Sequence, residues 1–444
     1  MPTKIVAILT CIVMILMIIL KPSLKFKHFN VDTFWIIALI GAIITFCVNP
    51  LKLGDVKSAL TASSALNPLK IIAILFGLSF LSLNLDELGF FKYLALYATK
   101  KVNQSQTKLF FILYALISFL TIFTSNDIII LTFTLFICYF SRLTKINPIP
   151  YLVMEFVAAN TYSLFLIIGN PTNIYLATNF DISFLSFLKT MALPTIAIGL
   201  TSILVLYLLF KKDLQKPFSN TLELNDIALT NKPLTIISII HLLGCMILLA
   251  IANYIKLEMW LICLGIAFSQ AIFTLIFDVV NKVRKKETNN HLLIIIKKLP
   301  FSLGIFVLSM YLIVLSLDRI NVFTNLSTFL NSLTCNSKFG YLLVYGISSF
   351  IACNIINNIP MSLAATPVLI NVTEAYQNAS VFVTILSSNL GALLTPIGAL
   401  AGIMWMRILK EQRINFSFFS FTKYGLVISP LLLAVGIGVL LLIL

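Results

Sequence analysis

Long apolar runs alternate with short polar segments along the whole chain. A membrane-spanning helix needs about 20 mainly apolar residues, and runs close to that length recur in both halves of the sequence. The pattern predicts an all-α polytopic membrane protein with the same order of spans in each half. The predicted spans are residues 4–20, 32–49, 65–83, 150–178, 184–210, 233–253, 257–278, 299–317, 379–409 and 417–443.

Between the third and fourth span of each half lie a short apolar segment and then two apolar arms separated by a few polar residues. The short segments, 90–98 and 322–333, are expected at the membrane interface. Because the arm 128–140 is too short to span comfortably, we predict a re-entrant hairpin in each half, with its polar tip inside the protein. The arms are 108–123 and 128–140 in the first half, and 340–356 and 361–370 in the second.

Two of the predicted spans are interrupted by polar runs that contain Pro and Gly, one at 160–173 and one at 387–399. Proline removes a backbone N–H and glycine lets the helix unwind. Freed backbone groups persist in a membrane only where they face protein or a wet cavity. Transporters hold substrates and coupling ions at such breaks, although a single break is equally typical of a Pro-kinked structural helix.

The two hairpin tips and the two breaks together supply the candidate substrate- and ion-binding residues. Asn and Thr side chains offer neutral donors and acceptors, and the N-termini of half-helices favour an anion or a polar oxyacid. Buried Asn also holds helices together without any ligand. The candidates are Ser125, Asn126, Asp127, Asn160, Thr161, Gly169, Asn170, Pro171, Thr172, Asn173, Asn357, Asn358, Pro360, Ser388, Asn389, Gly391, Thr395, Pro396 and Gly398.

Matching landmarks in the two halves lie at a nearly constant distance along the chain, which indicates an internal duplication. Because each half carries an odd number of spans, the halves must be inverted. We therefore predict a first inverted repeat at 1–212, a cytoplasmic linker at 213–232 and a second inverted repeat at 233–444. The separations are 231 residues for Asn126 and Asn357, 229 for Asn160 and Asn389, 225 for Pro171 and Pro396, 232 for Asp86 and Asp318, and 225 for Trp35 and Trp260.

Composition and charge agree with a protein of the cell membrane. The chain is 59% hydrophobic and 11% charged, whereas soluble proteins carry about 25% charged residues. With the N-terminus outside, the predicted cytoplasmic loops hold 23 of the 31 Lys and Arg residues, as the positive-inside rule requires. The net charge of +15 therefore sits in short loops, and we expect no nucleic-acid partner. We read the first apolar run as a retained span.

Few acidic residues fall inside the predicted spans or hairpins. Asp127, at a hairpin tip, could carry a proton or bind sodium, and it could also cap the second arm of the hairpin. Glu155 lies near the predicted cytoplasmic edge, where a snorkelling or paired surface role is expected. The seven Cys residues include no CxxC and the three His residues form no cluster, so no metal site is expected.

Nothing in the sequence indicates an enzyme or a cofactor. We find no HExxH motif, no nucleophile dyad and no P-loop, so direct use of ATP is not expected. A channel would need a continuous polar pore, which the closed apolar pattern does not favour. The remaining class is a secondary transporter.

The sequence resembles the ion transporter superfamily, and within it the arsenite permease and sodium/proton antiporter branch, with a distant likeness to divalent anion:sodium symporters. The resemblance rests on the four polar motifs above and on Trp405. It implies a scaffold and a moving transport subdomain, elevator-type alternating access, a homodimer, and site residues on the four motifs. Arsenite permeases tend to carry Asp where this chain has Asn160 and Asn389, and a Pro-Lys pair where it has Ala392-Leu393.

For function, the resemblance implies transport of a small anion, oxyanion or metalloid of the arsenite or antimonite type across the cell membrane. The coupling ion would be a proton or sodium. A sodium/proton antiporter and a sodium-coupled symporter of di- or tricarboxylates are the alternatives.

Overall fold

The computed structural model describes residues 2–21, 23–26, 29–48, 54, 57, 67–100, 105–216, 229, 231–252, 254–284 and 290–444. Most of the predicted linker 213–232 and the start of the predicted span 65–83 lie outside this described part. The described chain is helical apart from one antiparallel pair of short strands, in which Ser23 pairs with Asp32. These strands occupy a segment predicted as a loop.

The elements of the first half follow the predicted order. They are α1 (Pro2–Leu20), β1 (Ser23–Phe26), β2 (Phe29–Asp32), α2 (Thr33–Val48), α4 (Pro68–Glu87), α5 (Phe90–Lys100), α6 (Gln106–Phe123), α7 (Asn126–Thr144), α8 (Ile149–Tyr162), η1 (Ile167–Gly169), α9 (Pro171–Asn179) and α10 (Phe184–Leu214).

Among the described residues, the helices of the second half follow a similar order, with a short helix, α13, between α12 and α14. The elements of this half are α11 (Lys232–Ile251), α12 (Met259–Val283), α13 (His291–Lys298), α14 (Phe301–Asp318), α15 (Val322–Leu333), α16 (Lys338–Ile356), α17 (Asn358–Ile370), α18 (Glu374–Gly391), η2 (Pro396–Gly398), α19 (Leu400–Glu411) and α20 (Phe418–Ile443).

The all-α prediction for a multi-pass membrane protein is confirmed. By length and composition, nine helices of the described part could cross a membrane. Their outer faces carry large apolar side chains at helical spacing: Leu200, Leu204 and Leu208 on α10 are each more than half exposed. Such a surface is stable against lipid chains and not against water.

Both predicted breaks are present. The span predicted at 150–178 is divided into α8, η1 and α9, and the span predicted at 379–409 is divided into α18, η2 and α19. The expectation of a short arm at 128–140 is wrong, because α7 has 19 residues and is about 28 Å long. Its length alone does not make it re-entrant, and the re-entrant hairpin stays a prediction.

Several helix boundaries in the two halves repeat at similar spacing along the chain. The helices α5, α6 and α7 begin 232 residues before α15, α16 and α17. Across the breaks the spacing is 229 residues, since α8 and α18 end at Tyr162 and Gly391, and α9 and α19 begin at Pro171 and Leu400. Two predicted pairings are therefore corrected: Asn126 matches Asn358 by position, and Pro171 matches Leu400.

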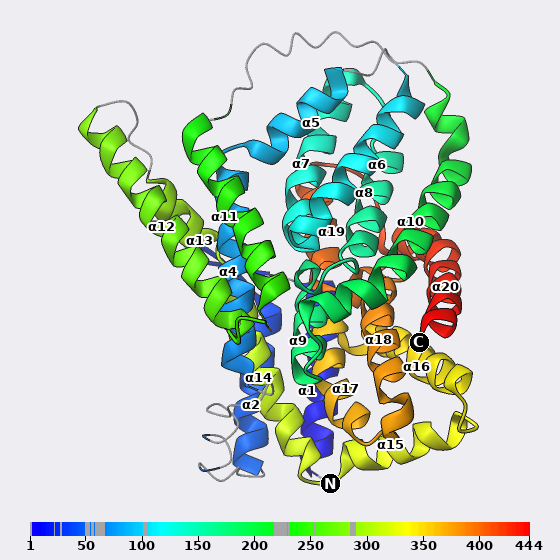
Figure 1. The fold of residues 1–444 in the computed structure, drawn as a ribbon. Coiled ribbons are helices and arrows are strands. Elements are labelled where there is room, and N and C mark those ends of the chain that lie inside the picture. The colour runs from blue at the N-terminus through cyan, green and yellow to red at the C-terminus, as the bar shows by residue number, and fades with distance from the viewer. Residues whose placement is uncertain are drawn as a thin grey trace.

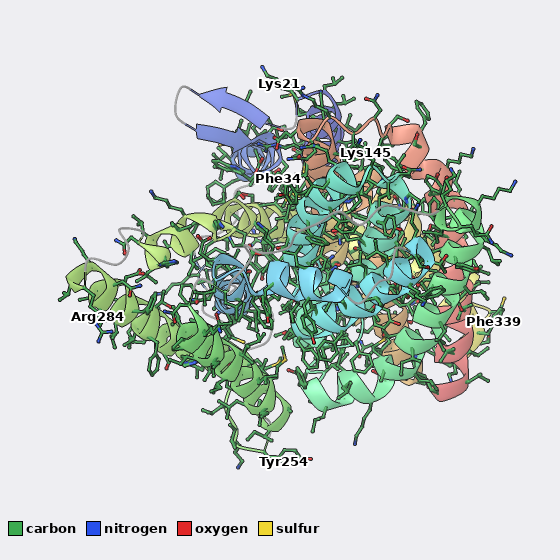
Figure 2. All side chains as sticks on the ribbon, turned by 90° about the horizontal axis from the view of Figure 1, so that it is seen from above. Lys21, Phe34, Lys145, Tyr254, Arg284 and Phe339 are labelled. Atoms are coloured by element: carbon green, nitrogen blue, oxygen red, sulfur yellow. The ribbon has the colours of Figure 1, made fainter. Side chains whose placement is uncertain are left out.

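The helices form two groups that lie side by side. One group, which we call the scaffold group, contains α1, α2, α4 and α11 to α14, and the other, the broken-helix group, contains α6 to α10 and α16 to α20. Figure 1 shows α6 and α7 toward one end of the molecule and α16 and α17 toward the opposite end. Seen from above, α11 and α12, marked by Tyr254 and Arg284, project on the side opposite Phe339 (Figure 2). The inverted relation of the halves and the domain boundaries stay predictions.

Candidate functional site

A buried amide network joins the two broken helices, with Asn389 at its centre. The Oδ1 atom of Asn389 accepts hydrogen bonds from Nδ2 of Asn170, at 2.8 Å, and from Oγ of Ser163, at 3.0 Å. Its Nδ2 donates to Oδ1 of Asn173, at 2.7 Å. All four side chains are buried. The network therefore ties α18 to the break between α8 and α9.

A second set of contacts fixes the start of α9 against α18. Asn170 is the N-cap of α9, and its Oδ1 accepts from the backbone N and from Oγ1 of Thr172, both at 3.1 Å. Pro171 is the first residue of the helix, where a missing N–H costs nothing. The hydroxyl groups of Thr172 and Ser388 lie 3.0 Å apart, which links the two breaks once more.

The first hairpin tip contacts the first broken helix. Nδ2 of Asn126 donates to Oδ1 of Asn160 at 3.2 Å, and Asn160 donates in turn to the carbonyl of Phe156 at 2.9 Å. Ser125 is the N-cap residue of α7. The Oδ1 atom of Asn126 and the hydroxyl of Thr161 are buried and have no hydrogen-bond partner among the described residues.

The second hairpin makes the corresponding contacts with the second broken helix. Nδ2 of Asn354 donates to the carbonyl of Gly391 at 3.0 Å, and Thr395 donates to Oδ1 of Asn354 at 2.6 Å. Nδ2 of Asn357 donates to the carbonyl of Ile397 at 2.8 Å. Each hairpin is thus bonded to the break of its own half.

Two residues of these networks were missed from the sequence. Ser163 lies three residues after Asn160, to whose carbonyl it donates at 2.9 Å, and Asn354 lies in the last turn of α16, three residues before Asn357. Their helical spacing from candidate residues was the available signal.

Two glycines allow the chain to fold tightly at the breaks. A Cβ on Gly169 would lie 2.3 Å from the carbonyl oxygen of Ser163, and one on Gly398 would lie 2.8 Å from the carbonyl oxygen of Gly391. At the second hairpin tip, Asn357 has a φ of 72° and a ψ of 153°, a strained backbone conformation that favours glycine. Its side chain accepts from the backbone N of Ile359.

A cavity of about 270 Å³ lies between the scaffold group and the broken-helix group. Asp127 lines it and forms no ion pair with any described residue. Lys298 lines the same cavity and pairs with Glu87 at 2.5 Å. Of the candidate residues, Ser125, Asp127 and Pro171 line this cavity, and the amides of the network do not.

Several helices begin at this cavity. Residues in or next to the first turns of α2, α7, α9, α14 and α19 line it. Each helix N-terminus carries a partial positive charge and unpaired N–H groups. Together with Lys298 they favour a bound oxyanion or a hydroxylated ligand, while the Asp127 carboxylate offers a site for a cation or a proton.

The other tip residues lie elsewhere. Asn357, Asn358, Pro360 and Pro396 are placed at the second hairpin and break, outside the lining of the Asp127 cavity.

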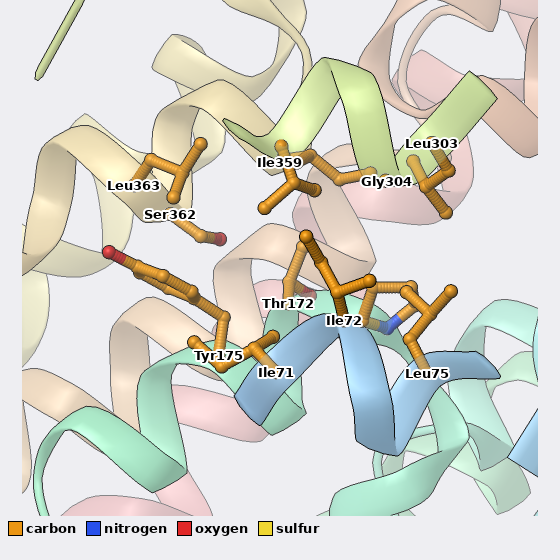
Figure 3. A pocket seen from close by; sticks show the side chains of 12 residues that line it. Ile71, Ile72, Leu75, Thr172, Tyr175, Leu303, Gly304, Ile359, Ser362 and Leu363 are labelled. Carbon is orange, nitrogen blue, oxygen red and sulfur yellow. The ribbon is translucent and has the colours of Figure 1, made fainter. Parts of the chain in front are cut away.

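A smaller pocket lies where α9 and α17 meet α4 and α14. Figure 3 shows Thr172, Tyr175 and Ser362 facing Ile71, Ile72, Leu75 and Leu303 across it. This pocket marks a largely apolar contact surface between the two groups.

The predicted surface role of Glu155 is wrong. Its side chain is fully buried in α8, because α7 covers that face of the helix. The hydroxyl oxygen of Thr134 lies 2.9 and 3.1 Å from the two carboxyl oxygens and 2.5 Å from the carbonyl oxygen of Ile130. The indole of Trp405 lies beside the same carboxyl group. In the described part of the chain, no three His, Cys, Asp or Glu residues are grouped so that they could hold a metal ion.

The comparisons with known proteins agree with this architecture. A family model described as arsenical pump membrane protein matches residues 6–443. The chain belongs to the arsenical pump membrane protein family. A relative from Escherichia coli strain K12, named arsenical pump membrane protein, is 26% identical over 356 residues, which cover 79% of this chain and 80% of the relative.

Two further proteins extend the comparison. A Bacillus subtilis protein named putative arsenical pump membrane protein is 23% identical over 397 residues, covering 85% of this chain and 87% of the relative. The crystal structure of the Alcanivorax borkumensis YdaH transporter covers 99% of this chain and 98% of its own, with a TM-score of 0.57 and 13% identity, so the two share a fold. This member of the arsenical pump family is a multi-pass membrane transport protein.

Proposed function

We propose that this chain is a secondary active transporter that moves a small metalloid or oxyanion of the arsenite or antimonite type across the cell membrane. The observation that carries the proposal is the Asp127 cavity, on which the first hairpin tip, both breaks and several helix N-termini converge. The names of the relatives support an arsenical substrate. We place the binding site at the cavity, with Ser125, Asp127 and Pro171 in its wall.

The amide network has a positioning role in this proposal. It holds Pro171 and the N-terminus of α9 in place through Asn170 and Thr172. Within the cavity, the hydroxyl groups of Ser79, Ser125 and Ser302 suit a hydroxylated metalloid, which both donates and accepts hydrogen bonds. The remaining candidate residues stabilise the breaks.

Asp127 is the coupling group in this proposal. A carboxylate inside a membrane protein is costly, and it commonly marks a proton or ion pathway. Asp127 has no partner cation among the described residues, so it is available to a proton or to sodium. We also propose elevator-type movement of the broken-helix group along the scaffold group, which the apolar contact surface in Figure 3 supports, and a homodimer through the scaffold.

Transport by everted membrane vesicles tests the proposal. We expect gradient-driven accumulation of arsenite or antimonite by vesicles that contain the protein. Asp127→Asn should abolish gradient-driven accumulation. It should leave intact the exchange of substrate across the membrane in the absence of an ion gradient, because the binding site remains while the coupling group is lost. Glu374→Gln, at an exposed acid on α18, is the matched control. Unchanged driven accumulation in Asp127→Asn would remove Asp127 from the mechanism.

A sodium/proton antiporter is the alternative, favoured by the unpaired carboxylate in a cavity. A thermal-shift screen of purified protein with arsenite, antimonite, phosphate, sulfate and di- and tricarboxylates, each in sodium or potassium, separates the two. A ligand that binds the folded state raises the melting temperature. A shift with sodium alone, and none with any anion or metalloid, would favour the antiporter.

A further inference from the structure

A second cavity, separate from the Asp127 cavity, forms an open groove of about 610 Å³ beside α1. Its walls come from the end of α1, from η2, from α19 and from the start of α20. One wall is apolar and includes Ile18, Ile403 and Met406. The groove therefore joins a helix of the scaffold group to the second break.

Basic side chains line the other end of the groove. Arg407, Lys410 and Arg413 all contribute to it, and no acidic residue of the described chain does. Arg407 is already paired with Asp32, at 3.4 Å, and with Glu411, at 3.0 Å. The side chains of Lys410 and Arg413 form no ion pair with any described residue, and both are exposed.

The position of these charges in the membrane is set by the chain topology. The segment 407–424 is a predicted cytoplasmic loop, and the cytoplasmic leaflet is the one that carries anionic lipids. Basic pockets between membrane helices on this side fit anionic headgroups. An apolar wall that continues from the basic end toward the break at Pro396 and Ile397 fits an acyl chain.

We propose that this groove binds an anionic phospholipid. The headgroup phosphate contacts Lys410 and Arg413, and an acyl chain lies along Ile403 and Met406 toward Ile18. Because α1 belongs to the scaffold group while η2 and α19 belong to the broken-helix group, a bound lipid connects the two groups and stabilises the arrangement seen here. The proposal does not depend on the identity of the transported substrate.

Native mass spectrometry of the purified protein, titrated with phosphatidylglycerol or phosphatidylcholine, tests the proposal. We expect retention of phosphatidylglycerol in preference to phosphatidylcholine. A basic residue near an anionic surface contributes about a fivefold factor in affinity, so the double variant Lys410→Gln, Arg413→Gln should bind phosphatidylglycerol about 30-fold more weakly. The matched control is Lys211→Gln, Lys212→Gln, at two exposed lysines that end α10. Equal loss in the control variant, or no loss in the double variant, would overturn the proposal.

A second variant separates a built lipid site from simple attraction of phosphate. Met406→Trp keeps all the charges and fills the apolar wall, so it should also weaken phosphatidylglycerol binding. Glycerol phosphate, which has the headgroup without acyl chains, should compete poorly with the lipid. If Met406→Trp binds phosphatidylglycerol as well as the parent protein, or if glycerol phosphate displaces the lipid at equal concentration, the groove is not a phospholipid site. Melting temperatures measured without anionic lipid show that each variant is folded.

Discussion

Replacing Asn389 by Ala tests whether the amide network holds the two broken helices together. The substitution removes the acceptor for Asn170 and Ser163 and the donor to Asn173. Ser163 keeps its hydrogen bond to the carbonyl of Asn160. The amide N–H of Asn170 and the Oδ1 atom of Asn173 lose these partners inside the protein, where water does not replace them.

The free-energy cost of Asn389→Ala follows from the two unpaired groups, on Asn170 and Asn173. A buried polar group that loses its partner costs about 1–3 kcal/mol, so Asn389→Ala should destabilise the protein by about 2–6 kcal/mol. For a chain of this size we expect a fall in melting temperature on the order of 5 °C. Ser387→Ala is the matched control on the same helix, because the buried hydroxyl of Ser387 has no hydrogen-bond partner among the described residues. Because its removal leaves no donor or acceptor unpaired, Ser387→Ala should not destabilise the protein.

Thermal unfolding of the purified variants in one detergent, followed by fluorescence, measures both effects. Asn389→Asp should be at least as unstable as Asn389→Ala, because a carboxylate oxygen would replace the Nδ2 atom that lies 2.7 Å from Oδ1 of Asn173. Melting temperatures for Asn389→Ala and Ser387→Ala that agree within error would refute the idea that the network contributes to stability. A stabilised Asn389→Asp variant would show that the site accepts an acid at this position.

Two further substitutions test other contacts of the site. Gly169→Ala should prevent stable folding, because the added Cβ would lie 2.3 Å from the carbonyl oxygen of Ser163, while Gly438→Ala, with no atom within 4 Å of its Cβ, should express normally on size-exclusion chromatography. Thr134→Val removes the hydroxyl that lies within 3.1 Å of both carboxyl oxygens of Glu155 and should lower stability by about 1–3 kcal/mol. Combining it with Glu155→Gln should cost less than the sum of the single variants, and an additive result would show that the two side chains are not coupled.

The breaks and hairpins could be located from the sequence because, in a membrane protein, the local order of apolar and polar residues largely determines where helices run and where they open. An apolar run of about 20 residues is expected to be a helix, because the helix is the spanning structure in which a single segment satisfies its own backbone in lipid. Pro and Gly within such a run mark the places where that helix opens. The helices α8 and α9 end and begin within a few residues of the predicted break, as do α18 and α19.

Matching individual residues between the two halves by residue type was less reliable than locating the breaks. The helix boundaries show why. Pro171 and Pro396 were matched because both are prolines in polar runs, but one begins α9 and the other begins η2. A proline is suited to the first turn of any helical segment, so the residue type does not fix its register. Only the helix boundaries showed that Leu400 occupies the position of Pro171.

The sequence alone determined which residues are polar within the membrane and where the backbone leaves the helix, because both follow from local chemistry. The tertiary structure decided which of those residues meet. It brought Asn389 to Asn170 across 219 positions, enclosed Glu155 behind Thr134, and left Asp127 facing a cavity. Contacts between distant segments depend on how whole helices pack, and no local pattern along the chain records that packing.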